Sequence, residues 1–161
     1  MGSQGQVETP KFRVELSDYS VSVDEWTRAQ NAPKSELPEL NEAQKAVAGK
    51  FGISEEKYAR SVLASRYGMR RLRARATRLG EEVERILRDV SSESKVTRVV
   101  ADMARERWVI VLQTPTRQVG IPVSREIGDD FLDFPTREAI EDLKARVKFG
   151  LEMGEKGISP K

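Results

Sequence analysis

The chain contains neither cysteine nor histidine among its 161 residues. Without cysteine there is no disulfide, no thiolate nucleophile and no cysteine-based zinc or iron–sulfur site. Without histidine the chain lacks the usual proton shuttle and the commonest transition-metal ligand. Most routes to an enzyme are thereby closed, so we expect a non-catalytic protein with no cofactor and no metal.

Long apolar runs are also missing. No segment approaches the roughly 18 apolar residues of a membrane span, and the first ten residues lack the apolar core of a secretory signal. We therefore expect a cytoplasmic protein with no membrane partner. The length allows a core without metal or disulfide, and we expect one domain over residues 11–152, between a disordered N-terminus (1–10) and a frayed tail (153–161).

Alternating apolar and polar residues predict the strands. Residues 11–23 alternate with one interruption, which is typical of an N-terminal strand with a bulge or of a short hairpin, and residues 31–40 carry two prolines and indicate a linker. A meander is expected at 96–103, 108–113 and 118–123. Its middle strand has no polar residue from 108 to 112 and should be central, with both faces covered. Pro122 cannot donate a ladder hydrogen bond, which places the last strand at an edge.

Capping residues delimit the helices. Asn41 with Gln44 fits a capping box and Gly52 a C-terminal stop, so a helix is expected from residue 42 to residue 51. Ser54 begins a second helix, which Gly68 either ends or merely weakens, and Thr136 begins the last one. The predicted fold class is α+β: a small, mainly antiparallel sheet, made of a three-stranded meander and a possible N-terminal edge strand, packed by amphipathic helices.

The stretch "QKAVAGKFGISEEKYARSV", Gln44 to Val62, resembles a helix-turn-helix of the DNA-binding kind. Val47 and Ala48 correspond to the first helix, Phe51-Gly52-Ile53 to the turn, and Ser54 to the start of the second helix. The resemblance implies a second helix that enters a DNA groove. Two ordinary packed helices are the alternative interpretation.

Charge is distributed unevenly although the net value is only +2. The formal charge is −2 for residues 1–36, +7 for 37–125 and −3 for 126–161. The segment "RYGMRRLRARATRLG", Arg66 to Gly80, holds six arginines and neither lysine nor acid. If a helix begins near Gly68, these cations oppose its dipole, and such a cost invites a functional explanation.

Arginine presents a planar fork of donors that grips phosphate or carboxylate in two places. We therefore expect a binding module that docks on a nucleic-acid phosphate backbone, or on an acidic protein surface, through this arginine-rich helix. A solvated face answered by the chain's own acids is the alternative. The candidate binding residues are Arg66, Arg70, Arg71, Arg73, Arg75 and Arg78.

Apolar residues on the same segment recur at the alternating three-and-four spacing of a heptad. This spacing favours a helix laid on a sheet, or else a seam with a second copy. The alternative function is therefore a protein–protein assembly or adaptor component, a homo-oligomer joined through this seam or through a sheet edge. The seam residues are Met69, Leu72, Ala76, Leu79, Val83 and Ile86.

Two patterns allow weaker enzymatic or metal-binding interpretations. Ser54-x-x-Lys57 and Ser92-x-x-Lys95 match a serine–lysine nucleophile pattern without any supporting motif. Three acids in "GDDFLDF" offer oxygen ligands to magnesium, namely Asp129, Asp130 and Asp133. A loop or short helix whose solvated acids face the arginines is the favoured interpretation of that segment.

Overall fold

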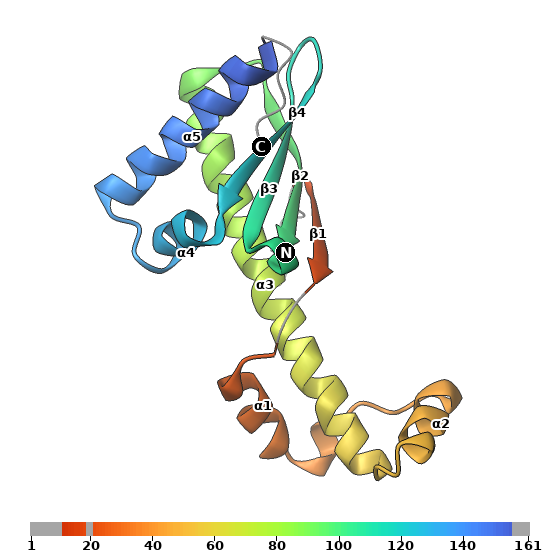
Figure 1. Ribbon diagram of the computed structural model, residues 1–161. Helices are drawn as coiled ribbons and strands as arrows, with labels where there is room; N and C mark the ends of the chain where they lie inside the picture. The colour runs from red at the N-terminus through yellow and green to blue at the C-terminus, as the bar shows by residue number, and fades with distance from the viewer. Residues whose placement is uncertain (1–10, 19–20, 156–161) are drawn as a thin grey trace, which may run out of the picture. The chain divides into compact units, whose positions relative to one another are not determined.

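The computed structural model describes residues 11–18 and 21–155 (Figure 1). The expected disordered N-terminus at 1–10 lies outside these residues, as do residues 156–161 of the expected tail. The chain forms two compact units: one joins the segment ending at Asp18 to everything from Arg73 onward, and the other is Tyr19–Leu72. Helix α3 (Glu55–Val90) contributes to both units. None of the helices in the described part of the chain is both long and apolar enough to cross a membrane.

The first unit contains a four-stranded sheet in the order β1-β2-β3-β4. The first strand is parallel to the second, and the other neighbours are antiparallel. The predicted α+β fold is thus confirmed, with its meander, its N-terminal edge strand and Pro122 in the opposite edge strand. The strands are β1 (Arg13–Asp18), β2 (Lys95–Asp102), β3 (Arg107–Gln113) and β4 (Gln118–Ser124).

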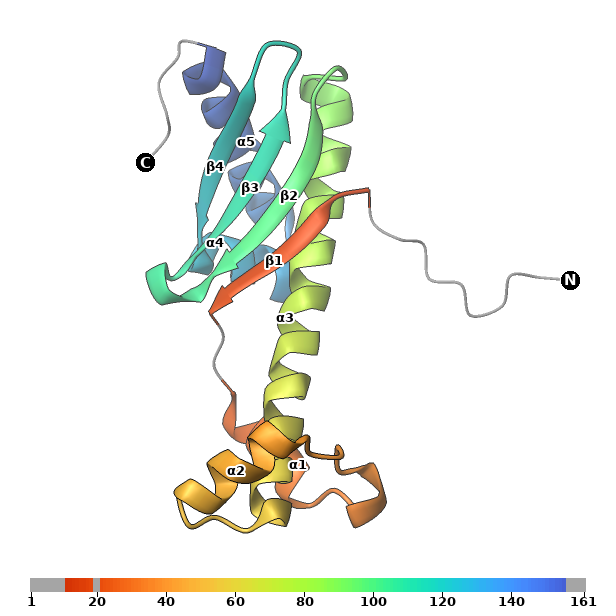
Figure 2. The same ribbon diagram turned by 90° about the vertical axis from the view of Figure 1, so that its right-hand side faces the viewer.

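One face of this sheet is covered. Figure 2 shows the part of α3 that belongs to this unit, α4 (Arg125–Asp133) and α5 (Arg137–Glu155) on the same face. The expectation that β3 is covered on both faces is wrong, because helices cover only one of them. Trp108 faces the helices and is buried, whereas on the opposite face Val109 is half-buried and Val111 is 8% exposed. On this open face Val109 lies between Val100 of β2 and Pro122 of β4, and the three side chains form one apolar row.

Glycines let these helices lie close to the sheet. A Cβ at Gly150 of α5 would stand 2.6 Å from Ile121 Cγ1, and Gly154 lies against Val119 in the same way. Because Gly154 is buried there and Leu151 is buried one turn earlier, α5 continues to Glu155. The expected tail at 153–161 is therefore wrong in its first three residues, which are helical.

The second unit consists of α1 (Val23–Gln30), a 3-10 turn, α2 (Glu42–Lys50) and the beginning of α3. Its core joins α1 to α3, and residues 31–40, expected as a linker, connect α1 to α2 inside the unit with Ala32 and Leu40 buried. The core cluster consists of Ala29, Ala32, Leu63, Ala64 and Tyr67, with Leu37 packed against it.

Helix α1 was not expected, because the alternation at residues 11–23 indicated strand. Ser22 and Glu25 instead form a capping box: Ser22 Oγ accepts from the Glu25 backbone N–H at 3.1 Å, and Glu25 Oε1 accepts from the Ser22 N–H at 2.9 Å. The spacing Ser-x-x-Glu is typical of a capping box and predicts the start of this helix.

Helices α2 and α3 are joined by the predicted tight turn. Gly52 adopts a left-handed φ of 67°, and the Ile53 N–H donates to the Ala48 carbonyl at 2.9 Å, which closes the end of α2. Ser54 Oγ accepts from the Lys57 N–H, so the predicted start of α3 is confirmed. Two helices joined by a tight turn are therefore present at the residues of the resemblance, and α2 buries only Ala48. Its use in reading DNA stays a prediction.

Candidate functional site on α3

The six candidate arginines lie on one continuous helix of 36 residues. Gly68 does not end this helix. One glycine costs a helix about 1 kcal/mol, and the burial of Tyr67 before it and Leu72 after it outweighs that cost. All six arginines are therefore more than two turns from either end of α3. The expectation that they oppose the dipole of a helix beginning near Gly68 is wrong, since the dipole acts within the first and last turns.

Two of the six arginines hold α4 against α3. Arg75 donates from Nη2 to Asp129 Oδ1 at 2.6 Å and from Nη1 to Asp133 Oδ1 at 2.8 Å. Burial disfavours the charge of Arg75, but the two carboxylates outweigh burial and raise its pKa. Arg78 Nη2 donates to the Leu132 carbonyl at 3.1 Å. Asp129 and Asp133 of α4 thus face the arginines, as the favoured interpretation of "GDDFLDF" predicts, whereas Asp130 does not pair with them.

The acids of "GDDFLDF" are not arranged as a magnesium site. Asp129 also accepts from Arg125 Nε at 3.2 Å, so its oxygens already serve two guanidinium groups. Among the residues that the structure describes, no group of three or more acids, histidines or cysteines is arranged to hold a metal ion.

Arg71 belongs to the second unit and fastens α1. Its Nε donates to Glu25 Oε2 at 2.9 Å. Burial of the Glu25 carboxyl opposes ionisation, but the Ser22 N–H and Arg71 outweigh it, so the pKa of Glu25 is lowered. The Glu25 charge is therefore part of what holds α1 on α3.

This pair makes a testable pH prediction. Because the pKa of Glu25 is lower in the folded chain, its stabilisation is complete above the ordinary glutamate value of about 4.3 and is lost as the pH falls through the lowered value. Glu25→Gln keeps the capping acceptor and removes the charge, so it should lower the urea midpoint at about pH 7, and this difference should be smaller at about pH 3. Exposed Glu39→Gln should leave the midpoint unchanged at both pH values, and equal behaviour of the two variants would contradict the prediction.

Arg66, Arg70 and Arg73 are free. All three side chains are exposed, and none of their guanidinium groups forms a hydrogen bond or ion pair with residues 11–18 or 21–155. Their spacing of four and three places them on one face of α3. We call them the arginine face.

No acid balances the arginine face along its own helix. The positions three and four residues away hold Val62, Leu63, Met69, Ala74, Ala76 and Thr77, or arginines of the face and Tyr67. Like charges at such spacings destabilise a helix by about 0.2–0.5 kcal/mol per pair. The face therefore carries a cost that no described contact offsets.

The apolar seam is occupied within the chain. Leu72, Ala76, Leu79, Val83 and Ile86 are all buried, and Met69 is half-buried. Gly80, on the same side of α3, lies directly against Val99 of β2. An oligomer joined through this seam would have to draw these side chains out of the core.

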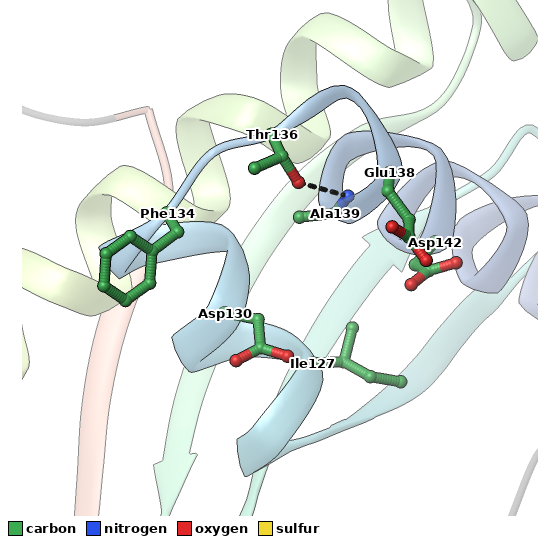
Figure 3. A pocket seen from close by; sticks show the side chains of 7 residues that line it. All are labelled: Ile127, Asp130, Phe134, Thr136, Glu138, Ala139 and Asp142. Carbon is green, nitrogen blue, oxygen red and sulfur yellow. Dashed lines mark hydrogen bonds between the residues drawn. The ribbon is translucent and has the colours of Figure 1, made fainter.

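An acidic hollow, which the sequence did not reveal, lies between α4 and α5 (Figure 3). It measures about 250 Å³ and is lined by Asp130 of α4 and by Glu138 and Asp142 of α5. Phe134, at its rim, is 73% exposed. The spacing of Glu138 and Asp142 indicates one helix face, but only the turn between the helices brings Asp130 to them.

Comparisons of the chain with protein-family models, with curated proteins and with solved structures found no match. The class of protein is therefore defined by the fold and the site alone: a two-layer α+β unit and a helical unit that share one long helix with an exposed arginine face.

Proposed function

We propose that this chain is a non-catalytic module that docks on the phosphate backbone of a nucleic-acid duplex through Arg66, Arg70 and Arg73. The observation that carries the proposal is that these three guanidinium groups are exposed on one face of α3 and lack partners among the described residues. Only three of the six candidate arginines are thus proposed to bind. Arg71, Arg75 and Arg78 instead form contacts within the chain.

The spacing of the face suits a charged strand. Seven residues separate Arg66 from Arg73, which at 1.5 Å per residue is about 10.5 Å along the helix axis. A nucleic-acid strand carries one phosphate per 3.4 Å or so of duplex axis, so the face meets about three phosphates. Each guanidinium fork can take two phosphate oxygens, a geometry that lysine cannot supply.

A duplex suits the face better than a single strand. Single-strand binding relies on aromatic side chains on which bases stack. Tyr67, the one aromatic residue among these turns, is buried in the core, and the Arg28 guanidinium lies 4.0 Å from its ring centroid. The face therefore offers charge without a stacking surface.

Backbone docking is proposed in place of base reading. In the helix-turn-helix resemblance, the start of α3 would enter the groove. Glu55 and Glu56 stand there, and Glu56 is already paired with Arg60 at 3.0 Å. Acids at this position meet the negative potential of the duplex, whereas the arginine face lies three turns further along α3.

The test is duplex binding across a salt series. Three phosphate contacts predict a slope of log K against log salt near −2.7, which is an affinity loss of about 40-fold between about 50 and 200 mM salt. Changing Arg66, Arg70 and Arg73 together to glutamine should weaken binding at low salt at least about tenfold and flatten this slope. Circular dichroism verifies that the variant is folded.

A control variant removes the same charge elsewhere. Lys50, Arg117 and Lys148 are exposed, and their side chains have no ion pair with the residues described, so the triple glutamine variant at these positions should bind the duplex with the native slope. If both triple variants lost the same duplex affinity, the loss would be an effect of net charge and not of the arginine face. Absence of binding at low salt would refute the proposal.

Assembly of copies is the competing proposal, and the acidic hollow is the observation that favours it. Arginines of one copy would meet Asp130, Glu138 and Asp142 of another in a head-to-tail contact. Sedimentation without nucleic acid separates the two proposals. Assembly predicts that the sedimentation mass rises with protein concentration and that it is lower in the arginine-face variant than in the native chain. Duplex docking predicts neither change.

A further inference from the structure

A second basic site lies in the first unit, at the place where α3 ends and β2 begins. A hollow of about 330 Å³ is bounded by the end of α3, by the residues that lead into β2 and by the residue two positions before β1. The polar residues that line it are Lys11, Glu84, Arg88, Ser92, Ser94 and Lys95.

The charges around this hollow are unbalanced. The side chains of Lys11, Arg88 and Lys95 are exposed, and none of their charged groups has a hydrogen bond or ion pair within residues 11–18 and 21–155. Glu84 is the one carboxylate among the lining residues, and its Oε1 accepts from the Val96 backbone N–H at 3.0 Å. Three cations against one carboxylate leave a formal charge of +2 around the hollow.

Hydroxyl groups complete the lining. Ser94 is buried, and its Oγ lies 2.8 Å from Ser91 Oγ. Ser92 is exposed, and its hydroxyl has no hydrogen bond with a described residue. The hollow thus combines cations with a hydroxyl that is free to donate, which is the donor set that phosphate oxygens use.

The end of α3 does not by itself account for these cations. A cation near a helix C-terminus is stabilised by the dipole, but only within the last turn. That explanation serves Arg88, which precedes the last residue of α3 by two positions. Lys11 and Lys95 come from other segments, and the last turn is already closed by the Ser91 N–H, which donates to the Leu87 carbonyl at 2.8 Å.

We propose that this hollow binds a phosphate monoester. A phosphate monoester carries a charge of about −1.5 to −2 at pH 7, which matches the formal charge of the lining. The volume is at the lower end of small-molecule sites, which span about 300–1,000 Å³, so a phosphate with a small attached group fits. Arg88 supplies a two-pronged contact, Lys11 and Lys95 supply point charges, and Ser92 donates a hydrogen bond. The serine–lysine pattern at Ser92 and Lys95 thereby acquires a binding role.

The test is titration of the full chain with inorganic phosphate at constant ionic strength, followed by amide chemical shifts of residues 92–96. Saturable shifts confined to this region are expected. Changing Arg88 and Lys95 together to glutamine should weaken phosphate binding by about tenfold or more. Arg85→Gln is the control: Arg85 is an exposed arginine of the same helix that pairs with Glu82 and does not line the hollow.

Two further measurements identify the source of the phosphate and distinguish this site from the arginine face. Stronger binding of a short 5′-phosphorylated oligonucleotide than of its 5′-hydroxyl form would assign the site to a nucleic-acid end, and equal binding of the two would assign it to free monoesters. The glutamine variant of the arginine face should keep native phosphate affinity. Absence of saturable phosphate binding, or native affinity in the folded Arg88 and Lys95 double variant, would overturn the proposal.

Discussion

Replacing Gly150 by valine should destabilise the protein by about 3 kcal/mol, the upper part of the range for overpacking a core. The first added carbon alone would stand 2.6 Å from Ile121 Cγ1 and 2.8 Å from Ile121 Cδ1. Ile121 belongs to β4 and is fully buried beneath α5, so the added methyl groups require the helix to move away from the sheet. Chemical denaturation of the variant measures the loss.

The matched control is the same substitution at Gly49. That glycine also lies inside a helix, but nothing stands within 4 Å of the position of its Cβ. Glycine and valine differ there mainly in helix propensity, so Gly49→Val should change stability by less than about 0.5 kcal/mol. A Gly150→Val variant as stable as the native chain would show that α5 does not lie as close to β4 as described.

Replacing Arg60 by methionine should loosen α1 by about 2–3 kcal/mol, the cost of leaving partly buried carbonyls without a charged donor. Arg60 Nη1 donates to the carbonyls of Ala29 at 3.0 Å, Gln30 at 3.0 Å and Ala32 at 2.7 Å. The side chain is only 14% exposed, so water replaces it poorly. A cation at the end of α1 also complements the dipole of that helix.

Hydrogen exchange of the α1 amides measures this effect. They should exchange faster in Arg60→Met by the factor that corresponds to the lost free energy, about 30- to 150-fold. Lys57→Met, an exposed change one turn earlier on α3, should leave exchange unchanged. Because Arg60 is not part of the arginine face, duplex binding by the folded variant should survive, and unchanged α1 exchange would contradict the assigned role of Arg60.

Local signals were sufficient for most of the elements. The caps at Asn41, Ser54 and Thr136 were predicted correctly because each depends on residues three positions apart. Each end of the three meander strands was predicted to within one residue, because alternation and turns are also local. The strand expected across residues 21–23 was wrong, since a capping box and an apolar alternation competed over the same few residues.

The arginines show what a local pattern cannot predict, namely which side chains find a partner elsewhere in the chain. Helical spacing placed all six on the polar side of one helix. Three of them are taken up by partners far along the chain: Arg71 by an acid 46 positions away, Arg75 by acids 54 and 58 positions away, and Arg78 by a carbonyl 54 positions away. No pattern within the segment distinguishes these from the free arginines.

The amino-acid sequence alone determined that this chain is an α+β protein without cysteine or histidine chemistry and with its positive charge concentrated on one helix. Only the tertiary structure decided that Arg66, Arg70 and Arg73 are the arginines left free and that Lys11, Arg88 and Lys95 surround one hollow. The reason is physical: spacing sets the direction of a side chain around its own helix, whereas its partner is set by whichever remote segment folds within about 3 Å of it.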